Sequence, residues 1–113
     1  MNVQDVVASL PVAVATGQQA LTNPVTGGYA SDLLSNVMGQ AAAGNIWVTM
    51  QGHQNIAAVA SLAGLAAIII AGDVEPAPET LRKADSEGIV LLTTTLPVFE
   101  VVGRLYQLGI RGV

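Results

Sequence analysis

The stretch Leu65-Ala-Ala-Ile-Ile-Ile-Ala-Gly72 decides the fold, because every position in it is apolar. A strand with this composition needs both of its faces buried, whereas a half-exposed strand would alternate apolar and polar residues. Short runs rich in branched side chains, ended here by Gly72-Asp73, are typical of parallel sheets covered by helices on both sides. We therefore expect this stretch to be the central strand of the molecule.

Length and composition restrict the class of protein. The chain has 113 residues, which predicts a single domain over residues 1–113. It has no cysteine, which excludes disulfides and thiolate metal sites and suits a reducing cytoplasm. The uncharged segment 56–71 is interrupted by Ser61 and Gly64 and is shorter than the ~20 residues of a spanning helix, so we expect no membrane segment.

Charged residues are few and unevenly placed. All four basic side chains lie beyond residue 81 and the net charge is −4, so we expect no nucleic-acid partner. Only 11% of the residues are charged, against ~25% in an ordinary soluble domain. A lone small monomer of this composition would expose much apolar surface, which indicates a homo-oligomer or another covered face.

Strands and helices alternate along the chain. Helical spacing predicts helices near residues 3–10, 31–43, 55–63, 78–86 and 97–108, and apolar runs predict strands at 12–16, 46–50, 65–72 and 89–93. Residues 18–29 contain Asn23-Pro24 and Gly27-Gly28 and predict a long connection. The expected fold is therefore an α/β, three-layer domain with a mainly parallel central sheet covered by helices on both faces.

Parallel sheets bind ligands where the carboxyl ends of their strands meet. The loops that we expect there are Thr16-Gly17, Gln51 to Asn55, Gly72-Asp73 and Thr93 to Thr95. Together with the glycine turn of the long connection, they supply the candidate ligand-binding residues. These are Thr26, Gly27, Gly28, Gln51, His53, Asn55, Gly72, Asp73, Thr94 and Thr95.

The segment Val25-Thr-Gly-Gly-Tyr-Ala-Ser-Asp-Leu-Leu-Ser35 resembles the signature of the DRTGG domain family. Asn55-Ile-Ala-Ala-Val-Ala60, Gly72-Asp-Val-Glu-Pro76 and Gly88-Ile-Val-Leu-Leu-Thr-Thr94 stand where later blocks of that family stand, so the resemblance covers nearly the whole chain. The Asp-Arg pair of the family name is replaced in its region by Asn23-Pro24. The resemblance implies an α/β domain similar to the amino-terminal domain of HPr kinase/phosphorylase, with a regulatory, dimer-forming role.

Several features have an ordinary structural interpretation beside the functional one. Thr26-Gly27-Gly28 either cradles an anion through backbone N–H groups or forms a tight turn, and Asp73 either accepts a ribose hydroxyl or caps a turn. His53 is the only histidine, so we expect a loop hydrogen bond rather than a metal site or a general base. Lys83 is the only lysine and no glycine-rich loop precedes it, which excludes a P-loop kinase.

Three functions remain open: a ligand-sensing dimer that binds a nucleotide or a small anion, a structural adaptor that binds a partner protein, and an enzyme. We expect the first, without catalysis and without a cofactor. The predicted helix after residue 31 has an apolar stripe too wide for one buried face, which suggests the dimer interface. The candidate interface residues are Tyr29, Leu33, Leu34, Val37 and Met38.

Overall fold

The computed structural model describes residues 1–112. Its five strands form one sheet in the order β1-β5-β4-β3-β2. The pairs β2–β3, β3–β4 and β4–β5 are parallel, and β1 is antiparallel to β5. The elements are α1 (Val3–Ser9), β1 (Ala13–Thr16), the short 3-10 helix η1 (Gln18–Ala20), β2 (Gly27–Ala30), α2 (Leu34–Gln40), β3 (Asn45–Thr49), α3 (Asn55–Ala63), β4 (Ala67–Ile70), α4 (Pro78–Ser86), β5 (Leu91–Thr93) and α5 (Val98–Gln107).

Strand β4 is the central strand, as the apolar run predicts. It pairs with β3 on one side and β5 on the other, and all four of its residues are fully buried. Ile69 belongs to the apolar cluster on one face of the sheet, whereas Ile68 and Ile70 belong to the cluster on the other face. The run is apolar at every position because each face of the strand meets a separate part of the core.

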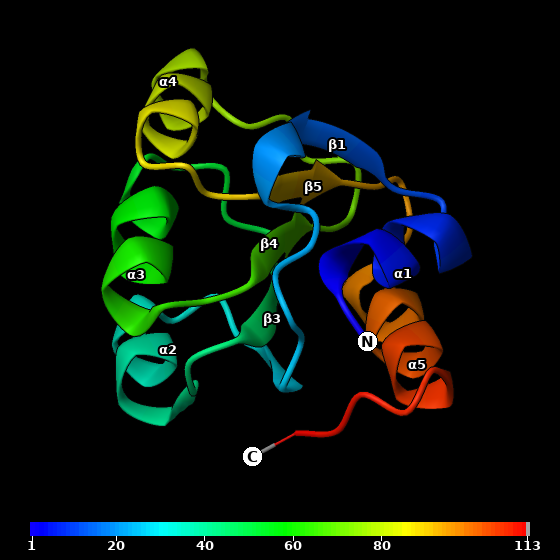
Figure 1. The fold of residues 1–113 in the computed structure, drawn as a ribbon. Helices are drawn as coiled ribbons and strands as arrows, with labels where there is room; N and C mark the ends of the chain where they lie inside the picture. Colours follow the sequence, from blue (N-terminus) through cyan, green and yellow to red (C-terminus); the bar gives the residue numbers. More distant parts are fainter. Residues whose placement is uncertain (113) are drawn as a thin grey trace.

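Helices cover both faces of the sheet, which confirms the predicted α/β three-layer fold. Helices α1 and α5 lie on one face and α2, α3 and α4 on the other (Figure 1). In α5, which follows Pro97, Val101 and Leu105 are buried against the sheet. Their spacing of four residues places both side chains on one side of the helix.

Two predictions for the region before α2 are wrong. Residues 27–30 form strand β2 within the segment that we expected to be a connection, and they pair in parallel with β3. Helix α2 begins at Leu34 rather than after Ser31, whose Oγ instead accepts a hydrogen bond from the Leu33 N–H at 3.0 Å. Leu33, which directly precedes the helix, is 58% exposed.

The direction of β1 also changes the expected site. Because β1 is antiparallel to β5, Thr16 pairs with Leu91 at the start of β5 rather than with its end. Thr16-Gly17 therefore lies at the amino edge of the parallel strands, opposite to the edge predicted for it. A Cβ on Gly17, whose φ is +83°, would stand only 2.6 Å from the Val90 Cα, so this corner of the sheet tolerates no side chain.

None of the helices among residues 1–112 is both long enough and apolar enough to cross a membrane.

Candidate functional site

A hollow of about 480 Å³ opens at the carboxyl edge of β4 and β5. Three segments supply most of its walls: Pro11 to Ala13 before and within β1, Asp73 to Pro76 after β4, and Thr93 to Thr95 at the end of β5. The antiparallel direction of β1 explains the first wall, because the start of β1 meets the end of β5. The hollow thus lies where β4 and β5 end and where β1 begins.

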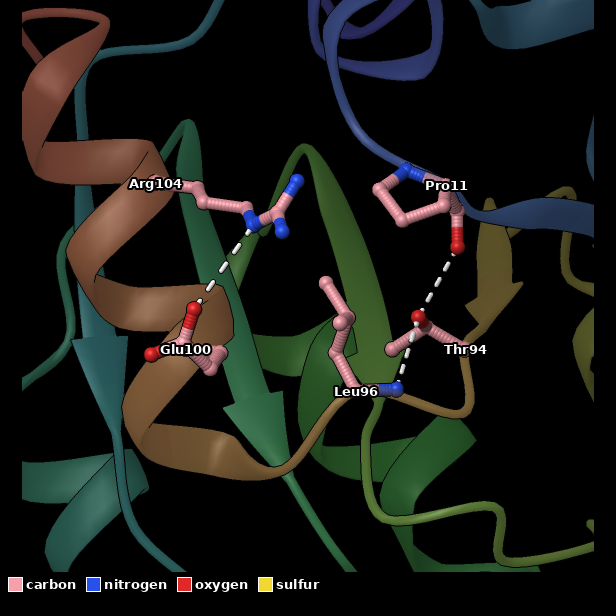
Figure 2. Close-up of polar contacts among 5 residues, drawn as sticks. All are labelled: Pro11, Thr94, Leu96, Glu100 and Arg104. Carbon is pink, nitrogen blue, oxygen red and sulfur yellow. Dashed lines mark hydrogen bonds and ion pairs between the residues drawn. The ribbon is translucent and has the colours of Figure 1, made fainter.

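Backbone hydrogen bonds join these segments and fix the shape of the hollow. The Gly72 N–H donates to the Leu96 carbonyl at 2.7 Å, and the Asp73 N–H donates to the Thr94 carbonyl at 3.0 Å. The Thr94 Oγ1 donates to the Pro11 carbonyl at 2.8 Å and accepts from the Leu96 N–H at 3.2 Å (Figure 2). The hydroxyl of Thr94 is therefore occupied by the backbone, and its role is to hold the walls together.

The exposed polar groups of the hollow are mostly oxygen atoms. Asp73 is the only non-glycine residue within residues 1–112 with a positive φ, +60°, a conformation that Asp adopts more readily than most residues. Asp73, Glu75 and Thr95 are exposed and line the hollow, and no Lys or Arg lines it. A ligand that donates hydrogen bonds suits this lining, whereas a bare anion would meet two carboxylates.

The loop after β3 lies at the same edge but outside the hollow. Asp32 Oδ1 accepts hydrogen bonds from the Thr49 Oγ1 at 2.7 Å and from the Met50 N–H at 2.8 Å, and the Gln51 side chain donates to the Asp32 carbonyl at 3.3 Å. Gln51 is thus held against the segment after β2. The predicted helix near residues 31–43 includes Asp32, and sequence reasoning missed that this residue anchors the end of β3.

The same loop is fastened to α4. The Thr80 Oγ1, fully buried, donates to the Gly52 carbonyl at 2.6 Å, and a Cβ on Gly52 would stand 2.9 Å from the Glu75 carbonyl oxygen. His53 and Asn55 are exposed, and neither lines the hollow. Of the expected site residues, only Asp73, Thr94 and Thr95 line it, while Gly72 shapes it through its backbone.

The expected placement of Thr26, Gly27 and Gly28 with the site is wrong, because the start of β2 lies at the amino edge of the parallel sheet. Their polar groups also have partners. The Thr26 Oγ1 donates to the Ala43 carbonyl at 2.7 Å, and the Gly28 N–H donates to the Arg111 carbonyl at 2.9 Å. The structure therefore favours the structural interpretation of this segment over an anion cradle.

The candidate interface on α2 is also corrected in part. Val37 is fully buried and belongs to the core, so it is unavailable to a partner. Tyr29 and Leu34 are half-buried against the same core cluster. Only Leu33 and Met38 are well exposed, and they lie five positions apart on different sides of the chain, so α2 presents no continuous apolar stripe.

Metal and acid–base chemistry have little support in the part of the chain that the structure describes. No group of three or more His, Asp or Glu side chains that could hold a metal ion occurs within residues 1–112. His53 is exposed in a loop, and its carbonyl accepts a hydrogen bond from the Ile56 N–H at 3.2 Å. No hydrogen bond among the described residues joins its side chain to a hydroxyl or a carboxylate.

Sequence reasoning missed one wall of the hollow, formed by Pro11, Val12 and Ala13. The sequence indicates this wall only indirectly: Pro11 marks the end of the first helix and the start of the next strand. Glu75 and Pro76 belong to the segment Gly72 to Pro76 that resembles a block of the family, but they were not assigned to the site. These residues supply the apolar surface and the second carboxylate of the hollow.

The fold resembles that of a solved regulatory protein. The regulatory region of Clostridium perfringens pyrophosphatase, which contains CBS and DRTGG domains and was solved with the activator diadenosine tetraphosphate, superposes with a TM-score of 0.74. The match covers 94% of this chain at 14% sequence identity, and this chain spans 46% of that one. No family model and no curated protein sequence matches the chain. The resemblance to the DRTGG domain is thus confirmed at the level of the fold.

Proposed function

We propose that this protein is a non-catalytic regulatory module that senses a small ligand and acts as a homodimer. The observation that carries the proposal is the hollow at the carboxyl edge of β4 and β5, whose walls are held in place by hydrogen bonds of Thr94 and of the Gly72-Asp73 backbone. A pre-formed hollow at this edge is where ligands bind in parallel α/β sheets. The lack of cysteine suits a reducing cytoplasm, which is part of the proposal.

The chemistry of the hollow favours a nucleotide over a small anion. The Asp73 carboxylate can accept hydrogen bonds from ribose hydroxyls, and the wall formed by Pro11, Val12 and Val74 offers apolar surface to a base. Because no cation lines the hollow, the phosphates of a nucleotide would point away from it into solvent. The similarly folded Clostridium perfringens region was solved with a dinucleotide activator, which supports the choice of ligand class.

A structural adaptor that binds a partner protein is the second candidate. Leu62 on α3 is 77% exposed and Phe99 on α5 is 86% exposed, so each is available for contact with a partner protein. The hollow has no evident role in an adaptor. We therefore place the ligand-sensing function first.

A thermal-shift series tests the proposed ligand. Adenosine, AMP, ATP and diadenosine tetraphosphate should raise the melting temperature, and inorganic phosphate alone should not. A ligand present at a hundredfold excess over its Kd stabilises the folded state by about 2.7 kcal/mol. The absence of a shift with all four adenosine compounds at millimolar concentration, or an equal shift with phosphate alone, would contradict the nucleotide proposal.

Two variants locate the binding. Asp73→Asn keeps the side-chain shape and the left-handed backbone but removes the charge, and Thr95→Val removes an exposed hydroxyl, so both should reduce the ligand-induced shift. Asp85→Asn is the matched control, because Asp85 is an exposed carboxylate on α4 that does not line the hollow. An equal loss of the shift in Asp73→Asn and Asp85→Asn, with none in Thr95→Val, would show that the ligand responds only to net charge and would contradict binding in the hollow.

A further inference from the structure

A second hollow, of about 290 Å³, lies between helix α5, the edge strand β2 and the segment that follows α5. It is separate from the carboxyl-edge hollow, because the two share no lining residue. Its volume is close to the lower limit of the ~300–1,000 Å³ range of pockets that hold small ligands. Its lining is mostly apolar, with Arg111 as the one charged residue and no Asp or Glu from residues 1–112.

The sequence of β2 creates this hollow. Gly28 and Ala30 line it from β2. Their partners on β3, Ile46 and Val48, belong to the core cluster on the face that α5 covers. Because side chains of paired residues lie on the same face of a sheet, β2 presents a hydrogen atom and a methyl group where β3 presents two branched side chains. A space therefore remains under α5 at the edge of the sheet.

The segment after α5 closes the third side of the hollow. The Ile110 N–H donates to the Leu105 carbonyl at 3.1 Å, and the Gly28 N–H donates to the Arg111 carbonyl at 2.9 Å. The Gly28 N–H faces outward from the edge of the sheet, so a further strand that paired with β2 would need this donor. Because the chain already uses it, the hollow suits a small molecule better than an extended peptide.

Arg111 is held firmly at the rim. Its guanidinium carbon lies 4.0 Å from the centroid of the Tyr106 ring, and its Nη1 donates to the Tyr106 carbonyl at 2.6 Å. These contacts fix the guanidinium and use only one of its N–H donors. Among residues 1–112 no carboxylate forms an ion pair with it. A guanidinium fixed in this way is ready to bind a carboxylate through two parallel hydrogen bonds.

We propose that this hollow binds a small carboxylic acid with an apolar body, either a medium-chain aliphatic acid or an aromatic one. The body lies between α5 and the small residues of β2, and the carboxylate pairs with Arg111 at the rim. A cationic ligand would meet Arg111 and no carboxylate from residues 1–112 in this hollow. The site goes beyond the proposed function and does not depend on it, because it lies apart from the carboxyl-edge hollow and takes a ligand without base or ribose.

The expected affinity is modest. A ligand of about ten non-hydrogen atoms binds in the micromolar to millimolar range when each atom contributes the usual binding energy. The probes are therefore 3-phenylpropionate and octanoate, titrated to about 10 mM. Two matched compounds separate the parts of the ligand: 3-phenylpropionamide has the same body without the charge, and acetate has the charge without the body.

Titrations followed by amide ¹H–¹⁵N NMR locate the binding. Both acids should shift the amide signals of Gly28, Ala30 and Gly112, which line the hollow. The signals of Asp73 and Thr95 at the carboxyl edge should stay unchanged. The amide should bind at least about 10-fold more weakly than 3-phenylpropionate, and acetate should not bind. Absence of shifts with both acids, shifts centred on the carboxyl edge, or equal affinity of acid and amide would overturn the site.

Arg111→Gln tests the recognition of the carboxylate. It should weaken 3-phenylpropionate at least about 10-fold and leave the affinity for 3-phenylpropionamide unchanged. Arg104→Gln is the matched control, because Arg104 is an exposed arginine on α5 that pairs with Glu100 and does not line the hollow (Figure 2). An equal loss of affinity in the two arginine variants would mean that only overall charge matters, and it would overturn the role of Arg111.

Ala30→Leu tests the apolar part of the hollow. The larger side chain fills the space while Arg111 stays in place, so both the acid and the amide should bind at least about 10-fold more weakly. The melting temperature should stay within about 2 °C of wild type, because Ala30 is exposed on an edge strand. Val102→Phe fills the hollow from the α5 side and should have the same effect. Unchanged binding of 3-phenylpropionate by either folded variant would overturn the assignment, without bearing on the nucleotide site.

Discussion

Replacing Thr94 by valine should destabilise the protein by about 2 kcal/mol, because it removes the hydroxyl that links two walls of the carboxyl-edge hollow. Valine keeps the shape of the side chain, so the substitution leaves no cavity. The Thr94 Oγ1 donates to the Pro11 carbonyl at 2.8 Å and accepts from the Leu96 N–H at 3.2 Å (Figure 2). Each lost bond costs about 1 kcal/mol, and more where the remaining group is shielded from water.

Thr95→Val is the matched control, because Thr95 is the next residue, is exposed, and makes no side-chain hydrogen bond within residues 1–112. Its stability should stay within about 0.5 kcal/mol of wild type. Urea unfolding followed by circular dichroism measures both variants, and the melting temperature of Thr94→Val should fall by roughly 8 °C. Equal stability of the two variants would refute the assignment of Thr94 to the framework and Thr95 to the lining.

Four further substitutions, in three experiments, test the fold and the loops. Ile69→Asp places a charge between two buried faces and should cost more than about 4 kcal/mol, so a soluble and cooperatively unfolding variant would show that β4 is not central. His53→Ala should change the melting temperature by less than about 2 °C, and a zinc- or nickel-dependent shift seen only in wild type would contradict the loop role. Gly17→Ala and Gly88→Ala share a left-handed backbone, but only the first would clash, at 2.6 Å from the Val90 Cα. Urea unfolding should therefore show that Gly17→Ala loses at least about 2 kcal/mol more, and equal losses would mean that β1 can shift away from β5.

The core of the fold was predictable because its signals are local. The run around Ile69 is apolar at every position, and only a strand buried on both faces satisfies that composition. Helix α5 combines Pro97 at its start, apolar residues at helical spacing, and Gly109 after its end. Each of these features depends on neighbours within a few positions, so the sequence alone is sufficient to recognise them.

Strand β2 could not be predicted in this way. Its sequence, Gly-Gly-Tyr-Ala, has little strand propensity, and the extended conformation is stabilised by pairing with β3 and by the Arg111 carbonyl on its outer edge. A Cβ on Gly27 would stand 2.8 Å from that carbonyl oxygen. Glycine is therefore required at position 27 by the segment at Arg111, which lies far away in the sequence. Without knowledge of that contact, the two adjacent glycines indicated a turn.

The sequence located those site residues whose strands run parallel, and it misplaced the residues of β1, whose direction it does not reveal. The rule for carboxyl ends located Gly72-Asp73 and Thr94-Thr95 correctly at one edge of the sheet. It misplaced Thr16-Gly17 because no periodicity in the sequence indicates that β1 runs against its neighbour. For the same reason, the wall formed by Pro11 to Ala13 was not anticipated.

The pairing of β1 with β5 has a consequence for how the protein is made. Thr94 meets Pro11 across 83 positions of sequence, whereas β2, β3 and β4 each pair with the strand that comes next in the chain. On the ribosome, at ~5–20 residues per second, the first strand waits roughly 4 to 17 s for its partner to be synthesised. During this interval the remaining strands can assemble from local contacts, while the amino-terminal segment has no ladder to join. The growing chain thus completes its sheet with a strand that was synthesised before all the others in the sheet.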